Sequence, residues 1–181
     1  MPTSDRFGGI GEFYGYYHAT STMGQLLTAA ELGAALERRR AAGARIVLTN
    51  GVFDLLHIGH LRLLRQARGL GEVLVVGVNS DASVRRLKPG RPLVPELERA
   101  ELVAALEPVD YAVVFDEPTA KQLLERVRPA VYVKGGDYRP ATLPEAPTVR
   151  ALGAELVLLP LVADRSTSRL LRRLEAGAEL P

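Results

Sequence analysis

Two histidines three residues apart, His57 and His60, are the first candidates for chemistry in this chain. They stand in the stretch TNGVFDLLHIGH, which follows the apolar run 46–48 and precedes a leucine-rich run that begins at Leu61. This order predicts a strand, a turn and a helix whose first turn presents both imidazoles on one face. Helix N-termini carry free N–H groups and partial positive charge, so they bind phosphate. Two imidazole donors there suit a polyphosphate whose charge grows during a reaction.

A His-x-x-His pair could also belong to a structural surface or to half of a zinc site. Zinc needs about three or four ligands from His, Cys or carboxylates. The chain has no Cys, and its third histidine, His18, lies in the N-terminal segment. We therefore predict no resident metal ligands. The absence of Cys also excludes disulfides and thiolate catalysis.

Further polar clusters follow other predicted strands. The sequence GVNSD (77–81) ends the apolar run 72–78, KGGDY (134–138) follows the run 131–134, and DRSTS (164–168) follows the run 155–161. In parallel sheets, ligands bind beyond the carboxyl ends of the strands. A single hydroxyl suffices to cap a helix, so the consecutive Ser166, Thr167 and Ser168 offer extra donors for phosphate oxygens.

Strands and helices are predicted to alternate along the chain. Strands are expected at 45–49, 72–78, 111–115, 131–134 and 155–161, separated by helical segments that include 81–87, 96–106 and 119–127. Thr28 and Glu31 form a capping-box pattern that opens a helix ending near Gly43. This alternation predicts an α/β fold, a Rossmann-like doubly wound sheet of about five parallel strands in a single domain. We expect residues 1–24 to be a flexible N-terminal extension and 25–181 to form the domain.

Composition narrows the classes of partner. The 181 residues are 47% hydrophobic with a net charge of +2, and the basic residues are dispersed. We therefore expect neither nucleic acid nor a membrane as a partner, and a cytoplasmic location. Only three of the 23 basic residues are lysines, and two of them, Lys88 and Lys134, stand in motif-like loops. Lys is a common phosphate-binding point charge, not interchangeable with Arg.

Together these motifs resemble the His-x-Gly-His nucleotidyltransferase superfamily, which transfers a nucleoside monophosphate from a nucleoside triphosphate. Within it, the segments VNSDASVRRLK and VKGGDY resemble the adenylyltransferases of ADP-heptose synthesis, and the likeness extends over about 26–176. The resemblance implies transfer of AMP from ATP to a sugar 1-phosphate, heptose 1-phosphate, with pyrophosphate released and Mg²⁺ required. In many members of this family the domain is fused to a sugar kinase, and 181 residues leave no room for one, so we expect a stand-alone enzyme with a separate sugar kinase in the pathway. The sequence leaves a homo-oligomer open.

The resemblance also assigns site residues. His57, His60 and Lys88 are expected to be catalytic. The residues expected to bind the nucleotide are Thr49, Asn50, Gly51, Phe53, Asp54, Gly59, Asn79, Arg91, Arg99, Lys134, Gly135, Gly136, Asp137, Ser166, Thr167 and Ser168.

Two alternatives remain at this point. One is a cytidylyltransferase that acts on glycerol 3-phosphate or another alcohol phosphate, with the same fold and chemistry. The other is a non-catalytic nucleotide-binding module. The presence of His57, His60, Lys88 and Lys134 favours an enzyme.

Overall fold

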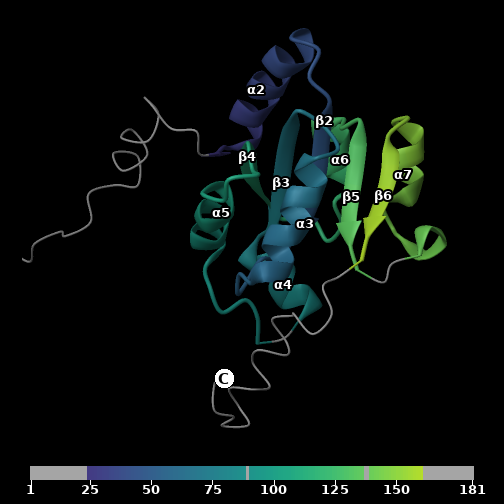
Figure 1. Ribbon diagram of the computed structural model, residues 1–181. Helices are drawn as coiled ribbons and strands as arrows, with labels where there is room; N and C mark the ends of the chain where they lie inside the picture. The colour runs from purple at the N-terminus through teal and green to yellow at the C-terminus, as the bar shows by residue number, and fades with distance from the viewer. Residues whose placement is uncertain (1–23, 89, 137–138, 161–181) are drawn as a thin grey trace, which may run out of the picture.

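Every strand in the described part of the chain runs parallel to its neighbours (Figure 1). The computed structural model describes residues 24–88, 90–136 and 139–160. Its strands are β1 (Gln25–Leu26), β2 (Ile46–Gly51), β3 (Val73–Asn79), β4 (Tyr111–Phe115), β5 (Val131–Gly135) and β6 (Glu155–Leu159). They form one sheet in the order β1-β4-β3-β2-β5-β6. The α/β doubly wound prediction is confirmed, with six strands in place of the expected five.

The helices are α2 (Ala29–Ala41), α3 (Ile58–Arg68), α4 (Asp81–Leu87), α5 (Glu96–Ala104), α6 (Lys121–Val127) and α7 (Ala146–Ala151), with a 3-10 turn, η2 (Pro140–Thr142), before α7. The predicted capping box opens α2. The side chain of Thr28 accepts from Glu31 N, and Glu31 Oε2 accepts from Thr28 N at 2.8 Å. The predicted helix 166–176 lies outside the described residues.

Two apolar layers cover the sheet, because alternate strand residues point to opposite faces. One face packs against α2, α6 and α7, through residues such as Leu36, Leu124 and Val149. The other packs against α3 and α5, through Leu64 and Val103. Figure 1 shows α3 in front of the strands. With both faces covered, the carboxyl edge of the sheet is where polar groups from several strands can meet.

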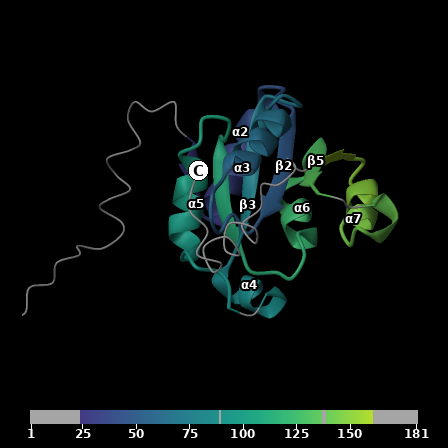
Figure 2. The ribbon, with the colours of Figure 1, turned by 60° about the horizontal axis from the view of Figure 1, so that its bottom comes forward.

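The chain changes direction in the sheet at β2. It runs from β2 to β3 and then to β4, and returns through α6 to place β5 on the other side of β2. Crevices at such switch points are where open α/β sheets bind ligands. The strand ends are aligned, since Thr49 pairs with Val133 and Gly51 with Val78. Figure 2 brings this carboxyl edge forward, with α4 below it.

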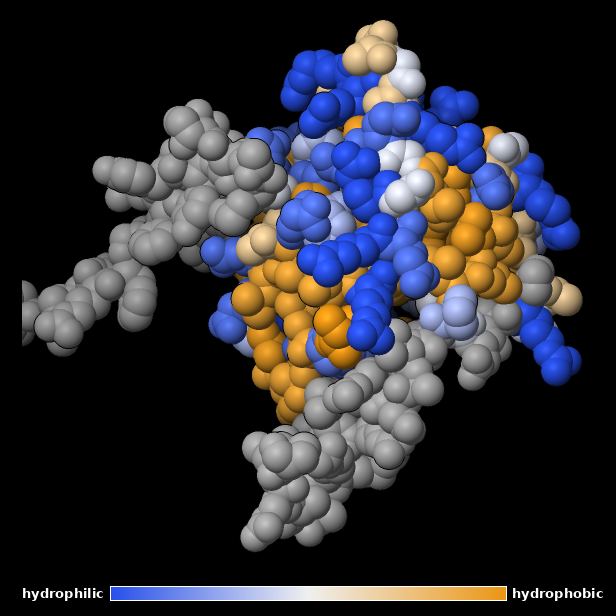
Figure 3. All heavy atoms as spheres, in the orientation of Figure 1, coloured by the Kyte–Doolittle hydropathy of each residue, from blue (hydrophilic) through white to orange (hydrophobic). Residues whose placement is uncertain are grey.

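The described surface is mixed in character. Arg62, Arg65 and Gln66 of α3 are exposed. Figure 3 shows a hydrophilic band down the middle of this view. An apolar area beside this band lies over α5, where Leu97 and Leu102 are exposed. No helix within the described ranges is long and apolar enough to cross a membrane.

Candidate active site

The histidine pair lies where β2 leads into α3. His57 is the N-cap of α3, and its Nδ1 accepts a hydrogen bond from Gly59 N at 3.1 Å. Its ring stacks on that of His60, with centroids 3.9 Å apart and planes inclined by 22°. The two imidazoles therefore share a face, as predicted, although His57 precedes the first helical turn.

The protonation of the two rings follows from their contacts. Because Nδ1 of His57 accepts from a backbone N–H, a neutral His57 carries its proton on Nε2, which becomes the donor. Burial, and to a smaller extent the charge of His57, lowers the pKa of His60 to about 4. At neutral pH, His60 is therefore an uncharged hydrogen-bonding group and not a cation.

Phe53 supports His60 from the signature turn. Its backbone adopts a positive φ of 50°, which is uncommon for a residue other than glycine. Its buried ring lies 5.2 Å from the His60 ring, centroid to centroid. A Cβ at Gly51 would lie 3.1 Å from this ring, so glycine makes room for it. Gly51 and Phe53, expected to bind nucleotide, thus shape the wall behind His60.

Asn50 joins the carboxyl ends of β2 and β5 across the switch point. Its Oδ1 accepts hydrogen bonds from Lys134 Nζ at 3.0 Å and from the Tyr132 hydroxyl at 2.7 Å. Tyr132 belongs to the apolar layer beside α6, so this cluster lies on the face of the sheet opposite α3. Burial lowers the pKa of Lys134, and Glu145 acts in the opposite direction. The sheet edge therefore has the histidine helix on one face and a partly buried lysine on the other.

Asp54 binds the loop that follows α4. The residue is 4% exposed, and its Oδ1 accepts from Leu93 N at 2.8 Å and Val94 N at 3.0 Å. Its Oδ2 lies 3.1 Å from Arg91 Nε. The carboxylate that was expected to contact nucleotide is therefore held by the protein's own groups.

The structure corrects the expected role of Arg99. Its guanidinium is fully buried, and it donates to Val52 O, Val94 O, Asn79 O and Asp81 Oδ1. These acceptors belong to the signature turn, the loop before α5 and the end of β3. The expectation of a phosphate contact from Arg99 is wrong, because the side chain is buried among these acceptors and ties the three segments together.

The Thr49 side chain requires a similar correction. It is fully buried, and its hydroxyl donates to Val133 O at 3.0 Å, so it closes the seam between β2 and β5 and does not offer a donor to phosphate. Asn79 ends β3 with its Nδ2 donating to Ser83 Oγ at 3.2 Å. Its predicted place beside the nucleotide stays a prediction.

The glycines allow close packing at the edge of the sheet. A Cβ at Gly135 would lie 2.9 Å from Leu63 Cδ1 on α3, so this glycine lets the histidine helix approach β5. Gly136 has a φ of 138° and donates to Leu159 O at 3.1 Å. The backbone of KGG is thus fixed between α3 and β6.

Lys88 lies at the carboxyl end of α4 and is exposed. Its carbonyl accepts from Arg91 N at 3.2 Å, so the loop turns directly after it. The expected contacts of Asp137, Ser166, Thr167 and Ser168 fall outside the described residues and stay predictions.

Comparison with known protein families identifies the family of this chain. Residues 48–165 match the family described as cytidylyltransferase-like. The chain belongs to this family. It is therefore a nucleotidyltransferase, as the sequence motifs predicted.

Relatives and solved structures agree with this membership. The chain is 46% identical over 159 residues to a protein named bifunctional protein HldE from Syntrophotalea carbinolica, an alignment that covers 87% of this chain and 32% of the relative. It is 48% identical over 144 residues to a protein of the same name from Geobacter metallireducens, covering 79% and 29%. The chain thus spans about a third of the length of these relatives. A lipopolysaccharide core biosynthesis protein from Thermoplasma volcanium superposes with a TM-score of 0.56 at 29% identity, covering 66% of this chain and 98% of that protein.

The described part of this nucleotidyltransferase contains no group of three or more His, Cys, Asp or Glu residues that could hold a metal ion. A zinc site built on the histidine pair therefore finds no such group of ligands among these residues.

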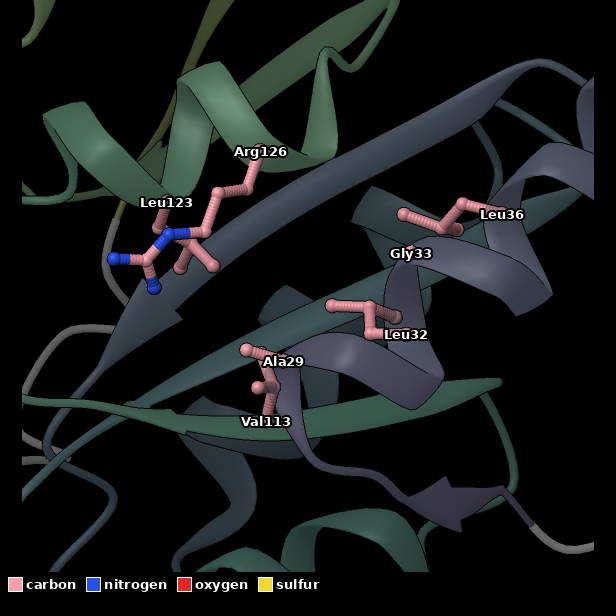
Figure 4. A pocket seen from close by; sticks show the side chains of 7 residues that line it. All are labelled: Ala29, Leu32, Gly33, Leu36, Val113, Leu123 and Arg126. Carbon is pink, nitrogen blue, oxygen red and sulfur yellow. The ribbon is translucent and has the colours of Figure 1, made fainter.

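A pocket between α2 and α6 is lined by Ala29, Leu32, Gly33, Leu36, Val113, Leu123 and Arg126 (Figure 4). Of these only Arg126 is charged, and it pairs with Glu117. This apolar pocket lacks the polar groups that a nucleotide needs.

Two residues of the candidate site were not predicted. Tyr132 stands two residues before Lys134 on the same strand, so period-two alternation could have placed both on one face. Glu145 is buried, accepts from Ala120 N at 3.1 Å at the start of α6, and raises the pKa of Lys134 against the effect of burial. Glu145 stands in a proline-rich segment that has no periodic signal.

Proposed function

We propose that this nucleotidyltransferase transfers AMP from ATP to heptose 1-phosphate, giving ADP-heptose and pyrophosphate. The reaction type rests on one observation, the stacked His57–His60 pair at the start of α3 beside the switch point. The choice of substrates rests on the segments VNSDASVRRLK and VKGGDY and on the identity of 46% with bifunctional protein HldE. The likeness to a lipopolysaccharide core biosynthesis protein supports a sugar-containing acceptor.

In the proposed reaction, an oxygen of the acceptor phosphate attacks the α-phosphorus of ATP. The bond from that phosphorus to the oxygen bridging the α- and β-phosphates breaks, and this oxygen leaves with the electron pair as part of pyrophosphate. A phosphate monoester has a second pKa of about 6, so the acceptor is largely ionised near pH 7 and needs no general base. Catalysis then consists of positioning and of stabilising charge.

His57 and His60 would stabilise the charge that develops on the triphosphate by hydrogen bonds from their ring N–H groups, and the lowered pKa of His60 keeps that ring uncharged. Positive charge would come from Lys88, Arg91 and Lys134. We propose that Mg²⁺ arrives as the ATP complex, where it offsets the charge of the triphosphate. The backbone of Gly135 and Gly136 would approach the nucleotide closely.

The test is pyrophosphate release from each of the four nucleoside triphosphates, across a panel of sugar 1-phosphates and alcohol phosphates. We expect turnover with ATP and heptose 1-phosphate. With CTP and glycerol 3-phosphate, kcat/KM should be at least about tenfold lower, which corresponds to about 1.4 kcal/mol of differential transition-state binding.

A second candidate is a cytidylyltransferase that acts on an alcohol phosphate, and the description of the matched family favours it. The same panel separates the two, because phosphate contacts are common to all four nucleotides and the base pocket makes the choice. A preference for CTP and glycerol 3-phosphate would establish this second candidate. No turnover with any pair would favour a nucleotide-binding module.

A further inference from the structure

We propose that Asp54 is a positioning residue that fixes the segment carrying Lys88 against the histidine turn. This inference rests on the proposed function, because it takes Lys88 to act on the phosphates of the nucleotide. It replaces the expectation that Asp54 itself contacts the nucleotide.

The contacts of Asp54 show what it holds. Both carboxylate oxygens face the loop that follows α4, through Leu93 N, Val94 N and Arg91 Nε, at distances of 2.8, 3.0 and 3.1 Å. The Asp54 side chain is 2% exposed. A carboxylate that accepts two backbone N–H groups and faces an arginine has its negative charge balanced by the protein. Without these partners, the carboxylate would repel an incoming triphosphate.

The position of Asp54 in the chain explains why these contacts matter. It directly follows Phe53, whose ring contacts His60, and it stands three residues before His57. The histidine turn and the loop after α4 therefore meet at one buried carboxylate. Arg99 reinforces the junction, since it donates both to Val52 O beside Asp54 and to Val94 O in the loop.

The anchored loop leads directly back to Lys88. Arg91 N donates to Lys88 O at 3.2 Å, and Lys88 N donates to Val84 O at 2.8 Å. The backbone of Lys88 is thus held by α4 on one side and by the turn to Arg91 on the other. The lysine side chain is exposed and has a long flexible stem, so its placement depends on how firmly this backbone is held. Loss of the Asp54 contacts frees the Arg91 end of the turn.

The experiment is a double-mutant cycle between Asp54→Asn and Lys88→Ala. Asparagine can still accept from Leu93 N and Val94 N, but it loses the ion pair with Arg91. We expect Asp54→Asn to lower kcat by about tenfold or more in the wild-type background, because small misplacements of catalytic groups are costly. In the Lys88→Ala background the same change should lower kcat by less than about twofold, since its effect passes through the lysine.

Asp110→Asn is the matched control. Asp110 also accepts from a backbone N–H, Leu74 N at 2.8 Å, and also pairs with an arginine, Arg68 Nε at 3.2 Å, but it lies just before β4 at the opposite edge of the sheet. We expect this control to lower the melting temperature while kcat stays within about twofold of wild type. If Asp54→Asn is too unstable to assay, Arg91→Lys perturbs the same ion pair from the loop side while it keeps the positive charge that the proposed function assigns to this residue.

Two results would overturn the inference. One is that the losses from Asp54→Asn and Lys88→Ala multiply, which would mean that Asp54 acts independently of the lysine. The other is that Asp110→Asn lowers kcat as much as Asp54→Asn does, which would mean general destabilisation. The cycle uses whichever nucleotide and acceptor pair turns over in the panel, so failure of the ADP-heptose assignment does not affect it. If no pair turns over, the same cycle is measured as dissociation constants for MgATP by calorimetry, with the same criteria.

Discussion

Replacing Arg99 with alanine should destabilise the protein severely and have little to do with nucleotide affinity. The guanidinium is fully buried and donates to three backbone carbonyls, those of Val52, Asn79 and Val94, and to the carboxylate of Asp81. Alanine provides no donor, so three carbonyls, one buried and two half-buried, lose this partner at once.

The magnitude follows from these contacts. A hydrogen bond to a charged group contributes about 1.5 to 3 kcal/mol, and the lower value suits carbonyls that water reaches after the truncation. Asp81 is partly exposed and keeps Arg85 at 3.7 Å, so its loss adds little. The expected destabilisation is about 4 to 6 kcal/mol, a large part of the 5 to 15 kcal/mol typical of folded domains. The melting temperature should fall by about 10 to 20 °C.

The assay is urea denaturation of Arg99→Ala beside Arg45→Ala. Arg45 also donates to a carbonyl, Leu70 O at 3.1 Å, and pairs with Glu155 at 2.8 Å, but it is exposed, and its removal should cost less than about 1 kcal/mol. With a slope of about 2 kcal/mol/M, the midpoint for Arg99→Ala should shift by about 2 to 3 M. A shift below about 0.5 M, together with a many-fold rise in the KM for ATP, would refute a structural role and restore Arg99 to the nucleotide site.

Three further predictions concern the histidine helix. His57→Ala and His60→Ala should each lower kcat by about 10²-fold with a smaller change in KM, because their bonds strengthen in the transition state; steady-state kinetics that show near-normal kcat would remove that histidine from the catalytic set. The free energy of unfolding should rise between pH 4 and about 6.5, because the folded pKa of His60, about 4, lies below the ordinary 6.5. The stabilising contribution of neutral His60 is complete above pH 6.5 and is lost as the pH falls through 4. Urea midpoints for His60→Gln should therefore change less with pH over this window than those of the wild type. Gly135→Ala should cost about 1 to 2 kcal/mol, because its Cβ meets Leu63, and adding Leu63→Ala should relieve the steric part; an unchanged melting temperature for Gly135→Ala would contradict this packing.

Local sequence patterns predicted most of the helices and strands well. They predicted the polar carboxyl edge of the sheet only in outline. The helix 81–87 and the strand 111–115 have the bounds expected from their capping and apolar patterns. β1 was missed because two residues cannot show a period, and only pairing with β4 makes them a strand. Strand position also placed Asn50, His57 and Lys134 at one edge, since parallel strands end together.

Side-chain partners could not be predicted in the same way. A motif shows that Asp54 and Arg99 stand near the site, but whether they face ligand or protein depends on residues 40 to 47 positions away along the chain, such as Val94 and Val52. The sequence predicts that Thr49 donates to phosphate, but its hydroxyl donates to Val133 O of β5. The partners of buried charges are set by the tertiary fold, so they could not be read from local spacing.

The place of β5 beside β2 has a consequence for how the protein is made. During translation the ribosome releases β2, α3, β3 and β4 before it synthesises β5, so the nascent chain carries its histidine helix beside a central strand that still lacks one neighbour. The open edge of β2 has the apolar sequence IVL, the kind of edge that other chains pair with. Aggregation during synthesis is therefore most to be expected in the interval before β5 emerges, and a stalled or prematurely terminated chain would stay in that state.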